Sequence, residues 1–485
     1  MRTHSLTALF LFTMACPFAA QNAIFSTGAL TSPSGLSADG TVAAGTNSSQ
    51  YFVWTEAGGT QFIGGVAAGT GLVGGQPKIS NSGTRVCGVT LNSGSGLHEM
   101  SLYSTASGTW TPLGGIGASC SVEISSGWGI SGDGLSLVGL GWLGCGGAHA
   151  IQWKQTTGVV TDLGSTVVNR SSRANGTDLD GDVVVGWQDA SSGFRQGAVW
   201  VNGVQTIITH AGTGAVLGEA QECSADGTWA VGLGVSSNSF QAYRWSAATL
   251  GQSLGTLPGV TNPRGGASAI SADGRIIVGF VRPFASPAAF GEGFLWREDL
   301  GMVNLTTWAK DMGIAVPAGT VFALPLAISD DGNVIAGQSR TASGFQGFVL
   351  RINELSANTW TLSQASGGSQ TLALKSAPAN AGKLYLVLGS TSGTMPGLSS
   401  GGFTLPLNLD AYFNLTLSAP NLAPLSTTLG FLNGSAQGSA GFALPAGYDP
   451  SLVGLTAHHA YVVLDVPGSG ALLDTSNAVS LKLVP

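Results

Sequence analysis

Two stretches of the chain match Gly-x-Ser-x-Gly, the pattern that holds the nucleophilic serine of many hydrolases. They are GQSLG at 251–255 and GLSSG at 397–401. Such a serine needs a strand before it and a helix after it, and neither stretch is followed by a helical pattern. Because 75 of the 485 residues are glycine, matches to this pattern also arise by chance. We therefore predict no catalytic residue at either stretch.

Two other stretches carry metal-binding residue types at spacings that do not suit a metal. His458 and His459 are adjacent, and neighbouring side chains of a strand point to opposite faces. NGTDLDGD at 175–182 has the composition of a calcium loop, but aligning its central glycine puts Gly176 and Trp187 at two ligand positions. We therefore predict no metal and no other cofactor, and an ordinary hairpin at 175–182.

Aromatic and basic side chains that suit a glycan or an extended peptide lie between strand-like runs. They are Trp142, Trp187, Arg195, Arg282, Phe284 and Arg340. Binding residues concentrate on irregular loops held by a rigid scaffold. We therefore predict that these six residues belong to a ligand-binding loop face.

A short phrase recurs along the chain and defines the elements that must position such a face. GLSADGTVAAGT begins at Gly35 and AISADGRIIVGF at Ala269. Asp-Gly between two β-rich runs predicts a hairpin, because Gly adopts positive φ and Asp bonds its own backbone. The turn residues of six copies are Asp39, Gly40, Asp133, Gly134, Asp180, Gly181, Asp226, Gly227, Asp273, Gly274, Asp331 and Gly332. A seventh copy, second along the chain, has Ser82 before Gly83.

The repeat length predicts a propeller. Successive turn glycines are between 43 residues (Gly40 to Gly83) and 58 residues (Gly274 to Gly332) apart, within the range of propellers and solenoids. Each copy holds four strand-like runs, the size of a propeller blade, whereas solenoid repeats are usually shorter or contain helices. The last copy lacks its fourth run, and 23–30 resembles the missing one. We predict an all-β chain with a seven-bladed β-propeller over 23–352, closed by its N-terminal strand.

These residues resemble a known family. Ser-x-Asp-Gly, a Val-rich strand ending in Gly, and HAIQW at 149–153 are similar to the bacterial extracellular repeat called the HAF family. The resemblance covers the propeller region and implies an extracellular repeat protein, but it implies no activity. The chain departs from the repeat at Ser82, where Asp is expected, and at Tyr103 and Leu350, where Trp is expected.

The first residue of the third run is polar in all copies. These residues are Gln50, Glu99, His149, Gln196, Gln241, Glu292 and Gln346. One interpretation is a ring of ligand-binding groups. We favour structural hydrogen bonds between neighbouring strands or blades, because buried polar groups need partners.

Four cysteines follow the first 20 residues, without the spacing of zinc knuckles. Cys120 and Cys145 fall in two loops that leave one blade on the same face, so we predict a disulfide between them. Cys87 and Cys223 fall at strand positions where other copies have apolar residues, and we expect both to be buried.

The last third of the chain has no repeat. Alternating runs lie at 360–365, 370–377, 383–390, 403–410, 412–419, 460–466 and 479–485. They predict a β-sandwich over 360–485, after a linker at 353–359. GSTSGTMPGL (389–398) and SNAVSLKLVP (476–485) resemble a terminal domain of large exported bacterial proteins. That resemblance implies a carbohydrate-binding module, a surface-attachment or sorting domain, or a folding cap.

Charge and leader residues bear on destination and partners. The net charge of −7 provides no basic face, so we expect no nucleic acid partner. Residues 1–20 predict a signal peptide, with Arg2 before an apolar core at 6–15. Lipidation of Cys16 remains an alternative. No later apolar run reaches the roughly 18 residues of a membrane span, so we expect a secreted or cell-surface monomer.

Three functions fit these patterns. We predict an exported, non-enzymatic binding or surface protein that recognises a glycan or a protein partner. A propeller-based glycan hydrolase or lyase is an alternative, and it would need convergent carboxylates where the repeat predicts Ala, Val, Ile and Ser in the channel. A purely structural envelope component is the third.

Overall fold

The structure is a computed structural model that describes residues 24–485 except 67–73, 235–240, 299, 313, 353–354 and 401–402. The predicted signal peptide and Cys16 lie outside the described residues. The chain divides into two units: one holds Ile24–Thr307 and Val316–Arg351, and the other holds Trp308–Ala315 and Ile352–Pro485. Both consist mainly of strands, so the predicted all-β class is confirmed.

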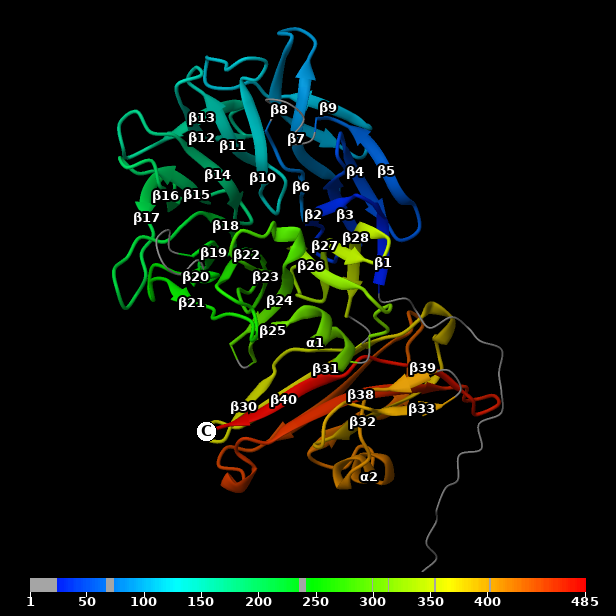
Figure 1. The fold of residues 1–485 in the computed structure, drawn as a ribbon. Helices are drawn as coiled ribbons and strands as arrows, with labels where there is room; N and C mark the ends of the chain where they lie inside the picture. The colour runs from blue at the N-terminus through cyan, green and yellow to red at the C-terminus, as the bar shows by residue number, and fades with distance from the viewer. Residues whose placement is uncertain are drawn as a thin grey trace, which may run out of the picture. The chain divides into compact units, whose positions relative to one another are not determined.

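The described residues of the larger unit form seven four-stranded antiparallel sheets, called sheets 1 to 7 below (Figure 1). Sheet 1 holds β2 (Ser32–Leu36), β3 (Val42–Thr46), β4 (Tyr51–Thr55) and β5 (Gly59–Gly64). Sheet 2 holds β6 (Lys78–Ile79), β7 (Arg85–Asn92), β8 (Leu97–Ser104) and β9 (Thr109–Pro112), and sheet 3 holds β10 (Ser125–Ile130), β11 (Ser136–Trp142), β12 (Ala148–Lys154) and β13 (Val159–Gly164).

The remaining sheets follow the same plan. Sheet 4 holds β14 (Ser172–Thr177), β15 (Val183–Asp189), β16 (Arg195–Val201) and β17 (Val204–Ile207), and sheet 5 holds β18 (Ala220–Cys223), β19 (Ala230–Gly232), β20 (Tyr243–Trp245) and β21 (Gln252–Ser253). Sheet 6 holds β22 (Pro263–Ile270), β23 (Ile276–Pro283), β24 (Glu292–Arg297) and β25 (Gly301–Asn304), with the short helix η1 (Ala288–Phe290) between β23 and β24.

Sheet 7 joins the two ends of the unit. It holds β26 (Val321–Ile328), β27 (Val334–Thr341) and β28 (Gly344–Arg351), and its fourth strand is β1 (Ile24–Ala29). β1 runs antiparallel to β28, with Ile24 opposite Leu350. The N-terminal strand therefore completes the last sheet, as predicted, and leaves no unpaired edge at the seam.

The Ser-x-Asp-Gly turns are held by one recurring set of hydrogen bonds. In sheet 6, Ser271 Oγ donates to Asp273 Oδ1 at 2.6 Å and accepts from the Ile276 N–H at 3.0 Å. In sheet 1, Gly40 has a φ of 67°, and a Cβ there would lie 2.4 Å from Val334 Cγ2. The motif thus fixes the turn by its side chains and by a glycine that nothing larger replaces without strain.

A closed ring of backbone hydrogen bonds links these turns, and we call it the turn belt. Its seven N–H to O=C bonds measure 2.8–3.3 Å and run Ala38 to Asn81, Asn81 to Gly132, Gly132 to Asp178, Leu179 to Ala225, Ala225 to Ala272, Ala272 to Asp330 and Asp330 to Ala38. The seven sheets therefore follow one another around a common axis, and the larger unit is a β-propeller. Below, the turn end is the end of this unit at the turn belt, and the loop end is the opposite end.

The core of the propeller lies between neighbouring sheets. One cluster joins Leu36 and Trp54 of sheet 1 to Val334 and Val349 of sheet 7. Equivalent clusters join sheets 2 and 3, 3 and 4, 4 and 5, and 5 and 6. Each sheet therefore buries its apolar residues against the next, which explains why one pattern is repeated around the ring.

The smaller unit holds two larger sheets and one hairpin. One sheet has the order β29 (Leu355–Ala357), β31 (Gly368–Lys375), β37 (Gln437–Leu444) and β35 (Leu425–Ser426). The other has the order β30 (Thr361–Ser363), β40 (Val479–Val484), β38 (Thr456–Leu464), β32 (Leu384–Ser390) and β36 (Leu429–Phe431), with β39 (Leu472–Thr475) paired to β38. The hairpin is β33 (Leu398–Ser400) and β34 (Phe403–Leu405). Leu372 and Ala440 of the first sheet share a buried cluster with Tyr385 and Tyr461 of the second.

Four helices lie outside these sheets among the described residues of the two units. They are α1 (Leu305–Asp311), η2 (Pro378–Asn380), α2 (Ala411–Ser418) and η3 (Pro450–Leu452). No helix in the described ranges is long and apolar enough to cross a membrane.

The structure corrects three predictions for the last third of the chain. Residues 412–419, predicted as a strand, form helix α2, because Asp410 caps its start by accepting the Phe413 N–H at 2.7 Å. The missed strand β37 is rich in small residues, and a Cβ on its Gly438 would lie 2.9 Å from the Tyr385 ring. Residues 355–357, expected in a linker, form β29 and pair with β31.

Candidate functional site

The first strands of the seven sheets surround a channel. Its turn-end part is a cavity of about 100 Å³. The lining includes a residue from each first strand: Ser34, Ile79, Ile130, Thr177, Cys223, Ile270 and Ile328. Since all seven sheets contribute, the cavity lies on the axis of the propeller.

Charged side chains lie in this channel, contrary to the prediction of Ala, Val, Ile and Ser there. Lys78 Nζ of sheet 2 lies 3.1 Å from Glu222 Oε2 of sheet 5, and the two side chains are 13% and 19% exposed. Both residues stand two places before the first residue of the turn motif, where the other copies have Gly or Ala. That shared position was the available signal, because opposite charges there had to meet inside a ring.

Two carboxylates complete the polar groups near the turn belt. Asp178 takes the place of the motif serine in sheet 4 and accepts from the Gly181 and Val183 N–H groups. Asp330 Oδ2 accepts from Asn81 Nδ2 at 2.8 Å. Burial raises the pKa of Asp178 and of Asp330 above the ordinary value.

A compact group of charged and aromatic side chains, the Arg173 cluster, lies at the loop end of sheets 3 to 5. The Arg173 guanidinium lies 3.7 Å from the centre of the Trp128 ring and 5.4 Å from that of Trp187. Glu219 bonds Arg173 at 2.6 Å and Arg195 at 2.7 Å. Desolvation alone would raise the pKa of Glu219, but the two arginines outweigh it and hold the pKa below its ordinary value.

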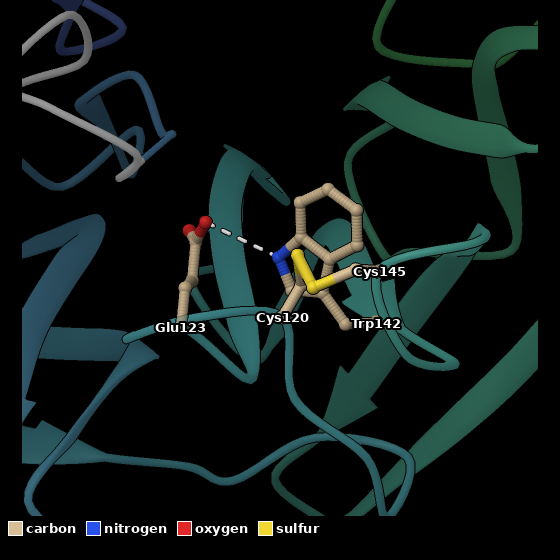
Figure 2. Close-up of a disulfide and its surroundings, with 4 residues drawn as sticks. All are labelled: Cys120, Glu123, Trp142 and Cys145. Atoms are coloured by element: carbon tan, nitrogen blue, oxygen red, sulfur yellow. Dashed lines mark hydrogen bonds between the residues drawn. A yellow bond between two sulfur atoms is a disulfide. The ribbon is translucent and has the colours of Figure 1, made fainter.

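Three of the six predicted ligand residues are engaged inside this region. Trp187 is 5% exposed, and Arg195 lies 4.1 Å above its ring. The Trp142 indole N–H donates to Glu123 at 3.2 Å, as Figure 2 shows. Glu123 is 1% exposed, and burial raises the pKa of its carboxyl group. Trp142 and Trp187 therefore stabilise the loop end from within.

The predicted disulfide between Cys120 and Cys145 is present, with the two Cα atoms 4.5 Å apart (Figure 2). It joins the loop that enters sheet 3 to the loop between the second and third strands of that sheet. Cys87 and Cys223 are buried free thiols, as predicted. Burial raises the pKa of both thiols, so neither is a reactive thiolate.

The other three predicted ligand residues lie at the loop end of sheets 6 and 7. Phe284 is 64% exposed, and Arg264 lies 4.9 Å from the centre of its ring. Arg340 Nη1 donates to the Ala289 and Gly291 carbonyl groups at 3.1 and 3.2 Å. Arg282 donates to the Ser286 carbonyl group. The structure thus places the six residues in two groups, and only the group of sheets 6 and 7 presents an exposed aromatic ring.

The remaining candidates of the sequence have structural surroundings. Ser253 lies on β21 and donates to Gln241, and Ser399 lies on β33, so neither serine precedes a helix. His459 is fully buried, with its Nε2 2.8 Å from the Tyr412 hydroxyl group. Within the described residues, no three His, Cys, Asp or Glu side chains gather closely enough to hold a metal.

The polar residues that begin the third strands bond mainly to the adjacent fourth strand. Glu99 accepts from the Gly114 N–H at 3.0 Å, and His149 Nδ1 lies 2.9 Å from the Asp162 carboxylate. Glu292 accepts from Asn304 Nδ2 at 3.0 Å. These bonds support the structural interpretation over a ring of ligand-binding groups.

No protein-family model matches the chain, and no curated protein matches it. Solved structures that align with it include TolB from Acinetobacter baumannii, with 13% identity, a TM-score of 0.37, and coverage of 57% of this chain and 63% of that one. An oligogalacturonate lyase in complex with manganese aligns with 12% identity and a TM-score of 0.46 over 70% of this chain and 96% of that one. The β-propeller domain of the Trilobed protease from Pyrococcus furiosus aligns with 11% identity and a TM-score of 0.42, over 67% and 94%. At these values, none of the likenesses carries an argument about activity.

Proposed function

We propose that the chain is an exported, non-enzymatic binding or cell-surface protein whose loop end recognises a glycan or a protein partner. In this proposal the larger unit is a seven-bladed propeller related to HAF-type repeats, and residues 360–485 form a β-sandwich. Residues 1–20 are a signal peptide, and the mature protein is a monomer. The Cys120–Cys145 disulfide is compatible with an oxidising compartment outside the cytoplasm.

The observation that carries the proposal is the exposed aromatic surface at the loop end. Phe284 and Phe290 are 64% and 56% exposed, although bonds from Arg282 and Arg340 hold the backbone around them. An ordered loop that leaves aromatic rings in water is typical of a recognition surface. The turn end has no equivalent, since its turns are occupied by the turn belt.

A glycan hydrolase or lyase is the alternative, and Glu123 is the observation that favours it. A buried carboxyl group with a raised pKa is a candidate general acid. Its oxygens are occupied by the Trp142 indole and the Gly74 N–H, which favours a structural role. Under the binding proposal, Glu123→Gln leaves the chain without any change in glycan turnover, and loss of a measured glycan-cleaving activity in that variant would support the alternative.

The test of the proposal is binding of the full chain to immobilised glycans and to extracellular protein extracts. We expect saturable binding that Phe284→Ala weakens at least tenfold. Phe62→Ala is the matched control, because Phe62 is 52% exposed on the outer strand β5. Equal effects of the two variants, or no saturable binding at all, would contradict the proposal and favour a structural envelope component.

A further inference from the structure

A second cavity lies in the channel, one step nearer the loop end than the first. Its volume is about 190 Å³. It is lined on the first strands by Gln221 and Ser268, two residues before the Cys223 and Ile270 of the turn-end cavity. Lys78 lines both cavities, so its ion pair with Glu222 lies at their border. We call this second space the upper cavity.

One side of the upper cavity is polar and has free hydrogen-bonding groups. Gln76, Gln221 and Ser268 line it, and their side chains make no hydrogen bond with any other described residue. Lys78 has three N–H donors, of which Glu222 takes one. Unmatched amide and hydroxyl groups at the wall of a cavity await either water or the polar groups of a ligand.

The other side of the upper cavity is apolar. Leu233, Phe280 and Leu326 line it from sheets 5, 6 and 7. Phe280 and Leu233 approach closely because Gly266 has no side chain: a Cβ there would lie 2.2 Å from Leu233 Cδ2 and 3.4 Å from Phe280 Cε1. The cavity thus presents an aromatic and aliphatic wall opposite a wall of amides.

Size and charge narrow the ligand further. The upper cavity is smaller than the roughly 300–1,000 Å³ of a site for a drug-sized molecule, so it suits a ligand of one ring. Its cationic group is already neutralised by Glu222 at 3.1 Å, so the site favours a ligand without net charge. A pyranose ring combines an apolar face of C–H groups with an edge of hydroxyl groups, which matches the two walls.

From these observations we infer that the upper cavity binds one neutral pyranose ring, the end residue of a glycan held at the loop end. This inference rests on the proposed binding function and names its ligand. Phe280 and Leu326 contact the apolar face of the sugar, and Gln76, Gln221 and Ser268 bond its hydroxyl groups. Lys78 and Glu222 form the floor.

The test is saturation-transfer NMR and calorimetry on the full chain with neutral methyl glycosides as probes, and with free serine as a zwitterionic probe. We expect saturable binding of at least one methyl glycoside. Gln221→Ala and Phe280→Ala each weaken it at least tenfold. Gln61→Ala and Phe62→Ala on the outer strand β5 are the matched controls and leave it unchanged.

The outcomes separate this inference from the proposed function. Glycoside binding that survives Gln221→Ala and Phe280→Ala but is lost in Phe284→Ala moves the sugar to the loop surface; it overturns the inference and keeps the proposed function. Binding of serine without any glycoside overturns the ligand class. Binding of a protein partner alone, with no small probe in the cavity, leaves it a water-filled space and overturns the inference. Absence of all binding overturns both.

Discussion

The two ends of the propeller are built on the same strands but use them differently. At the turn end, every sheet contributes one turn, and seven backbone hydrogen bonds of 2.8–3.3 Å close the turn belt. At the loop end, sheets 3 to 5 hold a buried group of arginines and tryptophans, whereas sheets 6 and 7 expose Phe284 and Phe290. Repetition thus serves stability at one end, and variation among the copies leaves the other end free to bind.

The largest expected effect is at the loop end, in Glu219→Gln. It leaves Arg173, whose side chain is 14% exposed, without its carboxylate, and we expect the free energy of unfolding to fall by about 3–5 kcal/mol. Glu56→Gln is the control, since the Glu56 side chain is 47% exposed in its pair with Arg351 and that pair should contribute under about 1 kcal/mol. Urea denaturation measures both, and equal losses would deny the cluster its role.

The same variant has a predicted pH dependence. The pKa of Glu219 in the folded state is below its ordinary value of 4.5. Its contribution to stability is therefore fully present above about pH 4.5 and is lost as the pH falls through the lower, folded-state pKa. The difference in unfolding free energy between wild type and Glu219→Gln should narrow in acid. A constant difference between pH 7 and pH 3 would refute this.

At the turn end, Gly40→Ala should be nearly as harmful. A φ of 67° costs a non-glycine residue about 1–2 kcal/mol, and the contact of its Cβ with Val334 at 2.4 Å adds about 1–3 kcal/mol of overpacking. Gly59→Ala is the matched control, because Gly59 has a φ of 62° and a Cβ there would have no atom within 4 Å. It should lose only the backbone cost. Glycan binding should be unaffected in either variant at temperatures where the chain is folded.

Removal of the loop-end disulfide should have a smaller effect. Cys120 and Cys145 are 25 residues apart, and opening a loop of that length costs about 3 kcal/mol. The double variant Cys120→Ser with Cys145→Ser should unfold at lower urea, and its midpoint should no longer respond to a reductant. A wild-type midpoint that ignores the reductant would show that the bond does not stabilise the fold.

The smallest expected effect is loss of one side-chain bond in one turn. Ser271→Ala leaves the Ile276 N–H without the Ser271 Oγ acceptor at 3.0 Å, and we expect a loss of about 1–2 kcal/mol. Ser107→Ala, at an exposed turn where Ser107 bonds only Thr109, should lose less than about 0.5 kcal/mol. If the two variants were equally stable, the recurring serine would not be needed to hold the turn end.

The sequence predicted the turn end better than the loop end, for a physical reason. Each turn depends on local chemistry, Ser, Asp and Gly within four residues, so its conformation is visible in the pattern. The closing strand β1 was also predictable, because the last repeat lacked its fourth run. By contrast, the meeting of Lys78 and Glu222 depends on ring closure across 144 residues, and no local pattern contains it.

Predictions for the ligand residues and the last third of the chain were limited in the same way. Residue type alone could not separate Trp187, which is buried under arginines, from Phe284, which is exposed. In the smaller unit, the alternation at 412–419 favoured a strand, and only the contacts of Asp410 with Phe413, Thr391 and Ser392 made it a helix. Two of those contacts come from a segment about 20 residues away and are invisible in the run itself.

The claim that the loop end is the binding end is tested most directly by hydrogen–deuterium exchange on the full chain. The exchange is measured with and without the glycan or protein partner that binds most tightly. We predict slower exchange in 280–291 and 338–346, at the loop end of sheets 6 and 7, with no change at the Ser-x-Asp-Gly turns. Protection of those turns, or protection confined to residues 360–485, would contradict the account.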